Sequence, residues 1–130
     1  MIVSILRPAA FLFVLAASAS VALAAEPYGQ WKRPSTGTEV EFYDCAGKLC
    51  AKIVKVADVS KQSTVGTVIM AGSDKSRANV WKGDLLNTDD GKTYSGIVTL
   101  VDDTHLKLEG CGLMGLICKG ETWEKVVVAQ

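Results

Sequence analysis

Four cysteines are the residues of this chain whose type and spacing could do chemistry. Cys45 and Cys50 enclose the stretch CAGKLC, and Cys111 and Cys118 enclose a glycine-rich apolar stretch. Paired thiols bind metals, carry out redox chemistry or form structural disulfides. A redox CxxC motif beside a βαβ pattern is absent, and a four-thiolate zinc site requires shorter spacing and usually a reducing compartment. The spacing therefore favours two structural disulfides, for which four cysteines allow three pairings.

The other candidates for catalysis are one histidine and two pairs of aspartates. His105 follows an expected turn and has no cysteine or serine partner nearby in the sequence. The aspartates at 89–90 and 102–103 also fall in expected turns, where aspartate accepts hydrogen bonds from the local backbone. The sequence contains no metalloprotease, nucleophile-elbow, phosphate-binding or dinucleotide-binding motif. We therefore expect no enzyme activity, no cofactor and no metal site.

The N-terminal residues have the pattern of an export signal. One basic residue precedes an apolar run over 11–15, and small residues follow. Ala22 and Ala24 occupy the positions that signal peptidase reads, so we expect cleavage after Ala24, with Ala25 as the next candidate. The apolar run is shorter than the ~20 residues of a membrane-spanning helix. We therefore expect a signal peptide over 1–24 and a periplasmic or secreted protein.

The mature chain, 25–130, has a length that suits a single domain with one core. Removal of Arg7 with the signal peptide leaves 13 of the 14 Lys and Arg residues against 14 Asp and Glu, so the net charge becomes −1. This balance gives no electrostatic reason to expect nucleic acid or anionic lipid as a partner. No later segment is apolar enough to span a membrane.

Hydrophobic residues recur with a period close to two from Tyr28 onward, and short polar segments separate the runs. This pattern predicts an all-β domain. The expected strands include 28–33, 38–46, 65–72, 80–87, 92–101 and 121–128, and polar breaks are expected at 57–64 and 73–79.

The first hairpin bears on the disulfide pairing. A two-residue turn at 47–48 would place Cys45 opposite Cys50 and Phe42 opposite Ile53. This register pairs apolar residues and brings the thiols to the ~4.5 Å Cα separation of a non-hydrogen-bonded pair. It therefore favours a local disulfide between the first two cysteines.

The strand over 92–101 has the clearest alternation and is followed by a second hairpin. A three-residue loop at 102–104 would place Leu100 opposite Leu106 and Val98 opposite Leu108, with all four side chains inside. The inner face of this strand is expected to carry Tyr94, Gly96, Val98 and Leu100.

Gly96 is unusual within that strand, because a glycine packs nothing and weakens a strand unless something must approach the backbone closely. We prefer the ring of Trp81 or Trp123 as the neighbour. The alternative neighbour is a ligand.

The stretch GCGLMGLICKG, 110–120, is glycine-rich and apolar. The short loop between Cys111 and Cys118 favours a second local disulfide. The apolar residues of the loop either cap the core, which we prefer, or form an exposed contact surface. They are Leu113, Met114, Leu116 and Ile117.

The motifs GQW, CAGKLCAKIV, VWKGDLLNTDDGKTYSGIVTL, LKLEG and GETWEK follow one another along the chain. In this order they resemble the bacterial exported family called domain of unknown function 2147, over essentially the whole mature length. The resemblance implies a small antiparallel lipocalin-like β-barrel of about eight strands; the biochemical function of the family is unassigned. It also implies that Gly29 and Trp31 close one end of the barrel. Lys125 matches the basic position of the last strand that covers the indole ring.

Two hypotheses about function follow from the fold analogy. One is a periplasmic barrel that binds a small apolar ligand; the other is a structural or protein-contacting envelope domain, inhibitor-like, with a filled barrel. An apolar cavity of several hundred Å³ would support the first and a packed interior the second. The expected inner, ligand-facing positions are Val40, Phe42, Ile53, Ile69, Tyr94, Gly96, Val98, Leu100 and Leu108.

Overall fold

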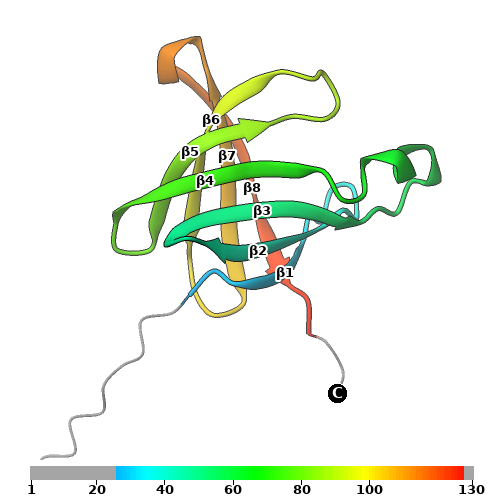
Figure 1. Ribbon diagram of the computed structural model, residues 1–130, viewed down its shortest axis with the longest axis horizontal. Coiled ribbons are helices and arrows are strands. Elements are labelled where there is room, and N and C mark those ends of the chain that lie inside the picture. Colours follow the sequence, from blue (N-terminus) through cyan, green and yellow to red (C-terminus); the bar gives the residue numbers. More distant parts are fainter. Residues whose placement is uncertain (1–25, 128–130) are drawn as a thin grey trace, which may run out of the picture.

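The computed structural model of the protein describes residues 26–127, which form one closed antiparallel β-barrel (Figure 1). The strands follow one another around the barrel in chain order, and β1 (Gly29–Lys32) pairs with β8 (Ile117–Lys125) to close it. The others are β2 (Glu39–Cys45), β3 (Lys48–Lys55), β4 (Val68–Arg77), β5 (Val80–Leu86), β6 (Thr93–Leu100) and β7 (His105–Gly112). The predicted all-β barrel is confirmed, and the expected signal peptide lies outside the described residues. No helix within 26–127 is long and apolar enough to cross a membrane.

The loops at the two ends of the barrel differ in length. Short turns at 46–47, 78–79 and 101–104 connect the strands at one end, which we call the closed end. The connections at the other end, the open end, are mostly longer and contain two 3-10 turns, η1 (Val59–Thr64) and η2 (Leu113–Gly115). The open end therefore has more loop residues that could line a site than the closed end has.

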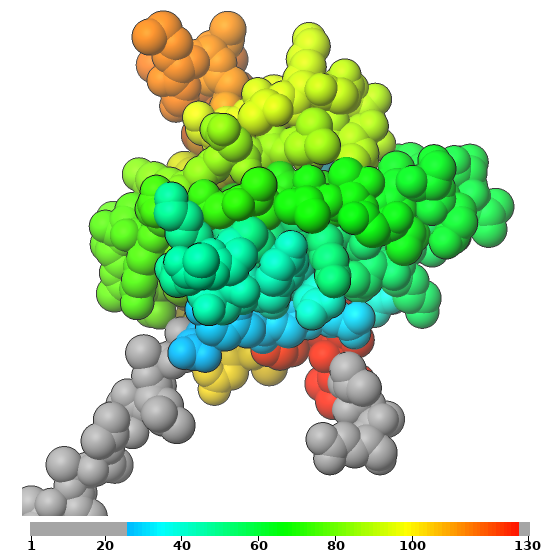
Figure 2. All heavy atoms as spheres, in the orientation of Figure 1, coloured from blue at the N-terminus to red at the C-terminus, as the bar shows by residue number. Residues whose placement is uncertain are grey.

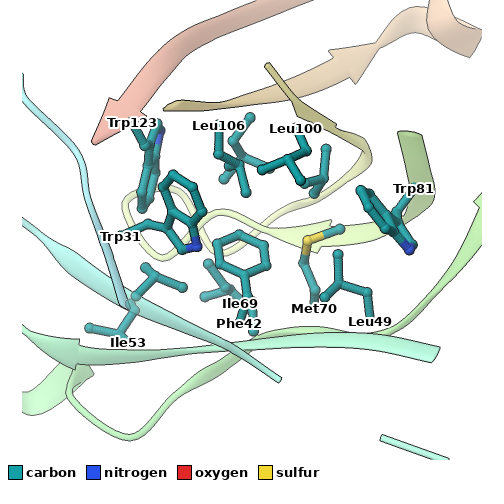
Figure 3. Packing of buried hydrophobic residues seen from close by; sticks show 14 residues of the cluster. Trp31, Phe42, Leu49, Ile53, Ile69, Met70, Trp81, Leu100, Leu106 and Trp123 are labelled. Carbon is teal, nitrogen blue, oxygen red and sulfur yellow. The ribbon is translucent and has the colours of Figure 1, made fainter. Parts of the chain in front are cut away.

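The hydrophobic core lies inside the barrel, and all three tryptophans contribute to it (Figure 3). Trp31, Val40, Ala51, Met70, Val98 and Leu106 have no exposed surface. Trp31 satisfies its ring N–H by donating a 2.8 Å hydrogen bond from Nε1 to the carbonyl oxygen of Pro27. A buried indole needs such a partner, so the chain before β1 is held against the barrel.

The β2–β3 hairpin has a different register from the predicted one. Its turn residues are Ala46 and Gly47, with φ of 56° and 84°, so Cys45 lies opposite Lys48 rather than Cys50. Two-residue hairpin turns of this type need positive φ at both central residues, and glycine suits the second position, which a turn at 47–48 would have given to lysine. The predicted turn is therefore wrong by one residue.

The inner and outer faces survive this shift, because the register moves by two residues and the side-chain period of a strand is two. Phe42 lies opposite Ala51 instead of Ile53, and both still face inward. Cys45 and Cys50 remain on one face and form a disulfide between diagonal positions, with 5.9 Å between their Cα atoms.

Strand β4 continues through 73–77, a segment whose polar composition predicts a break. Asp74 and Lys75 lie opposite Lys82 and Trp81 of β5. Backbone hydrogen bonds to a neighbouring strand do not require buried side chains, so a polar segment extends the hairpin here. The predicted break is wrong.

The β6–β7 hairpin has the predicted register. Leu100 lies opposite Leu106 and Val98 opposite Leu108, and all four side chains are buried. The alternation of hydrophobic residues is therefore sufficient to predict which side chains of this hairpin face the barrel interior.

Candidate functional site

A cavity of about 600 Å³ opens into the barrel at the open end. Part of its lining also belongs to the hydrophobic core, so the cavity begins where the packed interior stops. These shared residues are Val40, Ile53, Ile69, Leu108 and Trp123. We call them the floor; the barrel is packed toward the closed end and hollow above the floor.

The structure brings only some of the predicted ligand-facing residues to this cavity. Val40, Ile53, Ile69, Tyr94 and Leu108 line it. The remaining predicted positions are not part of the lining but are buried in the barrel interior: Phe42, Gly96, Val98 and Leu100.

Gly96 faces inward as predicted, but its neighbours are not aromatic. A Cβ atom at this position would lie 2.9 Å from Leu85 Cβ, 3.0 Å from the Gly83 carbonyl oxygen and 3.2 Å from Met70 Cε. The expectation that a ring of Trp81 or Trp123 approaches this glycine is therefore wrong. Aliphatic side chains from β4 and β5 occupy the space instead.

The closed end is sealed by the residues that the resemblance assigns to it. Lys125 Nζ lies 5.0 Å from the centroid of the Trp31 ring and donates a 2.7 Å hydrogen bond to the Tyr28 carbonyl oxygen. Gly29 has φ of 121°, and a Cβ atom there would lie 3.0 Å from Lys125 Nζ. Glycine is thus needed both for the backbone conformation and for the close approach of the lysine.

Charged side chains form the rim of the cavity, and among them only Asp89 was identified from the sequence, as a turn residue. Arg33 forms an ion pair with Glu121, which also accepts a 2.8 Å hydrogen bond from Ser35 Oγ. Lys61 of η1 donates a 3.0 Å hydrogen bond to Asp89 in the β5–β6 loop. The two ion pairs tie the open-end loops together and to β8.

Strand β8 contributes the remaining part of the rim. The alternation that buries Trp123 also turns Glu121, Lys119 and Ile117 toward the cavity, and all four line it. Extending the period of two backward from Trp123 would have found these residues. The glycine-rich composition of 110–120 hid that strand pattern. We use the term rim for Arg33, Lys61, Asp89, Lys119 and Glu121.

Tyr94 lies in the cavity wall, and its hydroxyl donates a hydrogen bond to the carboxylate of Asp90. This hydrogen bond raises the pKa of Tyr94 and lowers the pKa of Asp90. The pair therefore remains a neutral phenol and a carboxylate at neutral pH, and it holds the tyrosine ring in place.

His105 is the first residue of β7 and lies at the closed end, away from the cavity. Its Nδ1 atom is 2.9 Å from both Asp102 Oδ1 and Thr104 Oγ1. The backbone N–H of Thr104 and then the His105 ring lower the pKa of Asp102 to about 2. Because both side chains contact the same ring nitrogen, the arrangement stabilises a turn rather than forming a relay through the imidazole.

The β7–β8 hairpin extends past the barrel and exposes its apolar residues, so the prediction that they cap the core is wrong. Met114 is fully exposed and Leu116 is 85% exposed; Leu113 and Ile117 are also exposed. Strand pairing continues to Gly112 and Ile117, so the hairpin runs straight on instead of folding over the opening. Figure 2 shows this segment standing out from the rest of the molecule. We call Leu113, Met114 and Leu116 the tip.

A disulfide between Cys111 and Cys118 lies at the base of the tip, with 4.0 Å between the Cα atoms. Together with the Cys45–Cys50 bond, it confirms the predicted local pairing of the cysteines. Both bonds join neighbouring strands on the outer surface of the barrel, one near each end. The cysteines therefore do not contribute to the cavity chemistry.

A closed eight-stranded antiparallel barrel with one sealed end and a cavity at the other has a lipocalin-like fold. The chain belongs to the bacterial family described as "Uncharacterized protein conserved in bacteria (DUF2147)", which matches residues 29–125.

Among solved structures, the chain is similar to protein HP1028 from the human pathogen Helicobacter pylori, which is described as belonging to the lipocalin family. The identity is 23% and the TM-score 0.62, over 75% of this chain and 80% of that one. No curated protein matches the chain. The likeness to HP1028 shows a shared fold.

Proposed function

We propose that this protein is an exported binding protein that holds a small ligand with an apolar body in the cavity at the open end of its barrel. The observation that carries the proposal is the hollow of about 600 Å³ above an apolar floor. Small-molecule sites are typically concave, mostly apolar and about 300–1,000 Å³ in volume. The barrel walls are closed by continuous strand pairing, so the site is formed before a ligand arrives.

Titration with the neutral fluorescent probe N-phenyl-1-naphthylamine tests this proposal. We expect saturable one-to-one binding to the mature protein. Leu85→Trp should weaken binding about tenfold or more, because Leu85 lines the cavity and the larger ring would fill it. Val101→Trp, an exposed position near the closed end, is the matched control and should bind as the parent does. Absence of saturable binding, or equal binding by both variants, would contradict the proposal.

Export is supported by the two disulfides, because such bonds persist in oxidising compartments and are rare in the bacterial cytoplasm. Expression of the full chain, followed by osmotic-shock fractionation and intact-mass analysis, tests it. The released protein should begin at Ala25 and carry no free thiols. Recovery of the uncleaved, reduced chain from the cytoplasm would contradict export.

Binding without catalysis is the role that the arrangement of the charged groups supports. The rim carboxylates are engaged in ion pairs, and the chain's single histidine serves a turn at the opposite end. Ligand recovered from the protein after prolonged incubation should therefore be chemically unchanged by mass spectrometry.

A second candidate function is contact with another envelope protein, and the exposed tip is the observation that favours it. Clusters of large exposed apolar side chains are typical of contact sites. A photo-crosslinking amino acid at Met114 should give a discrete crosslinked product in living cells. The same group at Val59, an exposed apolar residue in η1, is the control and should give none. Identical patterns at both positions would contradict this candidate.

A further inference from the structure

The rim carries more positive than negative charge. Arg33 is paired with Glu121 and Lys61 with Asp89, whereas Lys119 forms no ion pair among the described residues. The lining of the cavity thus holds three cations and two carboxylates. One ammonium group at the edge of the cavity is therefore left without a counter-charge within the lining.

The position of Lys119 directs this charge toward the cavity. It lies opposite Gly110 on β7, in the same inward alternation as Glu121 and Trp123. Gly110 presents no side chain beside it, and a Cβ atom there would meet only Leu85 and Tyr94, at 3.7 and 3.8 Å. The lysine therefore borders open cavity rather than packed protein.

The floor and the rim together make the site amphipathic. A neutral apolar molecule would fill the floor but leave the Lys119 ammonium group unpaired, whereas an anionic head group would satisfy it. The lining has one positive charge in excess, so a monoanion would neutralise it, whereas a phosphate monoester of charge near −2 would leave a negative charge uncompensated.

We propose that the ligand of the cavity is a single-chain amphiphile with a carboxylate head group, its chain on the floor and its carboxylate at Lys119. This inference rests on the proposed binding function and goes beyond it by assigning the head group and the residue that recognises it. Because Lys119 is exposed and the contact is charge-assisted, the preference for the anion should be about tenfold at low salt.

Displacement of bound N-phenyl-1-naphthylamine by decanoate, decanol and decyl phosphate tests the inference. Decanoate should displace the probe at about a tenth of the concentration that decanol requires, and decyl phosphate should be no better than decanoate. Raising the salt concentration should reduce the preference, because exposed charges are screened.

Two variants locate the effect. Lys119→Gln should raise the concentration of decanoate needed to displace the probe until it is similar to the concentration of decanol needed. Lys82→Gln removes the same charge from the outer-facing side of β5 and should keep the tenfold preference. Comparison of their melting temperatures with that of the parent verifies that both are folded.

The outcomes separate the two proposals. Equal displacement by decanoate and decanol, a preference that survives Lys119→Gln, or its loss in Lys82→Gln would overturn the head-group assignment while binding stands. Tighter binding of decyl phosphate would overturn the carboxylate. If the probe does not bind and no amphiphile raises the melting temperature, the proposed function fails and this inference fails with it.

Discussion

Glycines in neighbouring strands leave space for larger side chains inside the barrel. Gly83, Gly96 and Gly110 lie opposite one another across β5, β6 and β7. A Cβ atom on Gly83 would lie 2.5 Å from Ser73 Oγ, and one on Gly96 would lie 2.9 Å from Leu85 Cβ. The row of glycines is therefore a packing feature, because side chains from β4 and β5 occupy the volume that it leaves.

We expect Gly96→Val to lower the free energy of unfolding by about 1–3 kcal/mol, the usual cost of overpacking a core. The added methyl groups would contact Leu85, Met70 and the Gly83 carbonyl oxygen. Urea denaturation measures the change, and Ser95→Val, on the outer face of the same strand, controls for strand propensity. Stability equal to the parent's would mean that the inner face of β6 is assigned wrongly.

Ser73 is fully buried, and its hydroxyl oxygen has no hydrogen-bond partner within the described part of the chain. Burying an unpaired hydroxyl costs about 1–3 kcal/mol. Ser73→Ala removes that cost, and we expect it to raise the free energy of unfolding by about 1 kcal/mol. The exposed Ser76→Ala on the same strand should change nothing measurable. A loss of stability in Ser73→Ala would reveal that the hydroxyl does have a partner.

The stability at acid pH should depend on Asp102. Its pKa is lowered from 3.8 to about 2 in the folded protein, so the ionised carboxylate stabilises the fold above pH 3.8. This contribution is lost as the pH falls from 3.8 toward about 2, because both states then become protonated. Asp102→Asn should reduce the drop in melting temperature over that range, and Asp103→Asn should leave it in place. Parallel profiles for all three proteins would contradict the role of Asp102.

At the scale of elements, each disulfide fixes the end of one hairpin. Cys45–Cys50 ties β2 to β3 beside a turn, and Cys111–Cys118 ties β7 to β8 below the tip. The loops that they close are short, so each contributes about 2 kcal/mol on the chain-entropy estimate. Their effect on motion should be local, because each pair joins strands that are already neighbours.

Replacing Cys111 and Cys118 together by serine should increase amide hydrogen exchange within 110–120, with little change in the rest of the barrel. Loss of the bond leaves the tip held only by the end of the β7–β8 ladder. The matched Cys45→Ser, Cys50→Ser protein should show faster exchange around 44–50 instead. Exchange that rises throughout the barrel in both proteins would mean that the disulfides hold the whole fold together.

The sequence predicts elements well where one face is buried. The β6–β7 register follows from its alternating leucine and valine residues, and the face assignment of the β2–β3 hairpin survives a wrong turn position. Pattern reasoning fails for 73–77, where strand pairing holds a polar segment in place. It also fails for the tip, because the sequence does not reveal whether a hairpin folds over an opening or projects from it.

The candidate site is predictable only in its apolar part. Ile53 and Leu108 lie on inner faces that the alternation identifies, and both reach the floor. Whether an inner residue such as Phe42 meets the cavity or the packed core depends on its height along the barrel axis, which periodicity does not encode. The ion pair between Arg33 and Glu121 at the rim joins residues far apart in the chain, so no local sequence pattern predicts it.

At the scale of the whole molecule, packing and binding occupy different halves of one barrel. The closed end has tight turns and the fully buried Trp31, with Lys125 over its ring. The open end has longer loops, a cavity and exposed ion pairs. Substitutions should therefore affect stability or binding according to the end at which they lie.

Trp31→Ala tests whether the closed end determines the stability of the barrel. Truncating a fully buried tryptophan costs about 3–5 kcal/mol, and here the Pro27 carbonyl oxygen also loses its donor. We expect a large fall in the urea midpoint for this variant. Lys61→Gln, which breaks an exposed ion pair at the rim, should cost less than about 1 kcal/mol.

Although Trp31→Ala should lower the stability of the barrel, it should not prevent ligand binding. A ligand that binds only the folded barrel stabilises it by mass action, so saturating N-phenyl-1-naphthylamine should raise the midpoint of Trp31→Ala as it does that of the parent. The cavity lining does not include Trp31, and the hollow should persist wherever the barrel is folded. An unchanged midpoint in Trp31→Ala without ligand would show that this end does not carry the stability. A folded Trp31→Ala protein that no longer binds the probe would show that the two ends are coupled through the core.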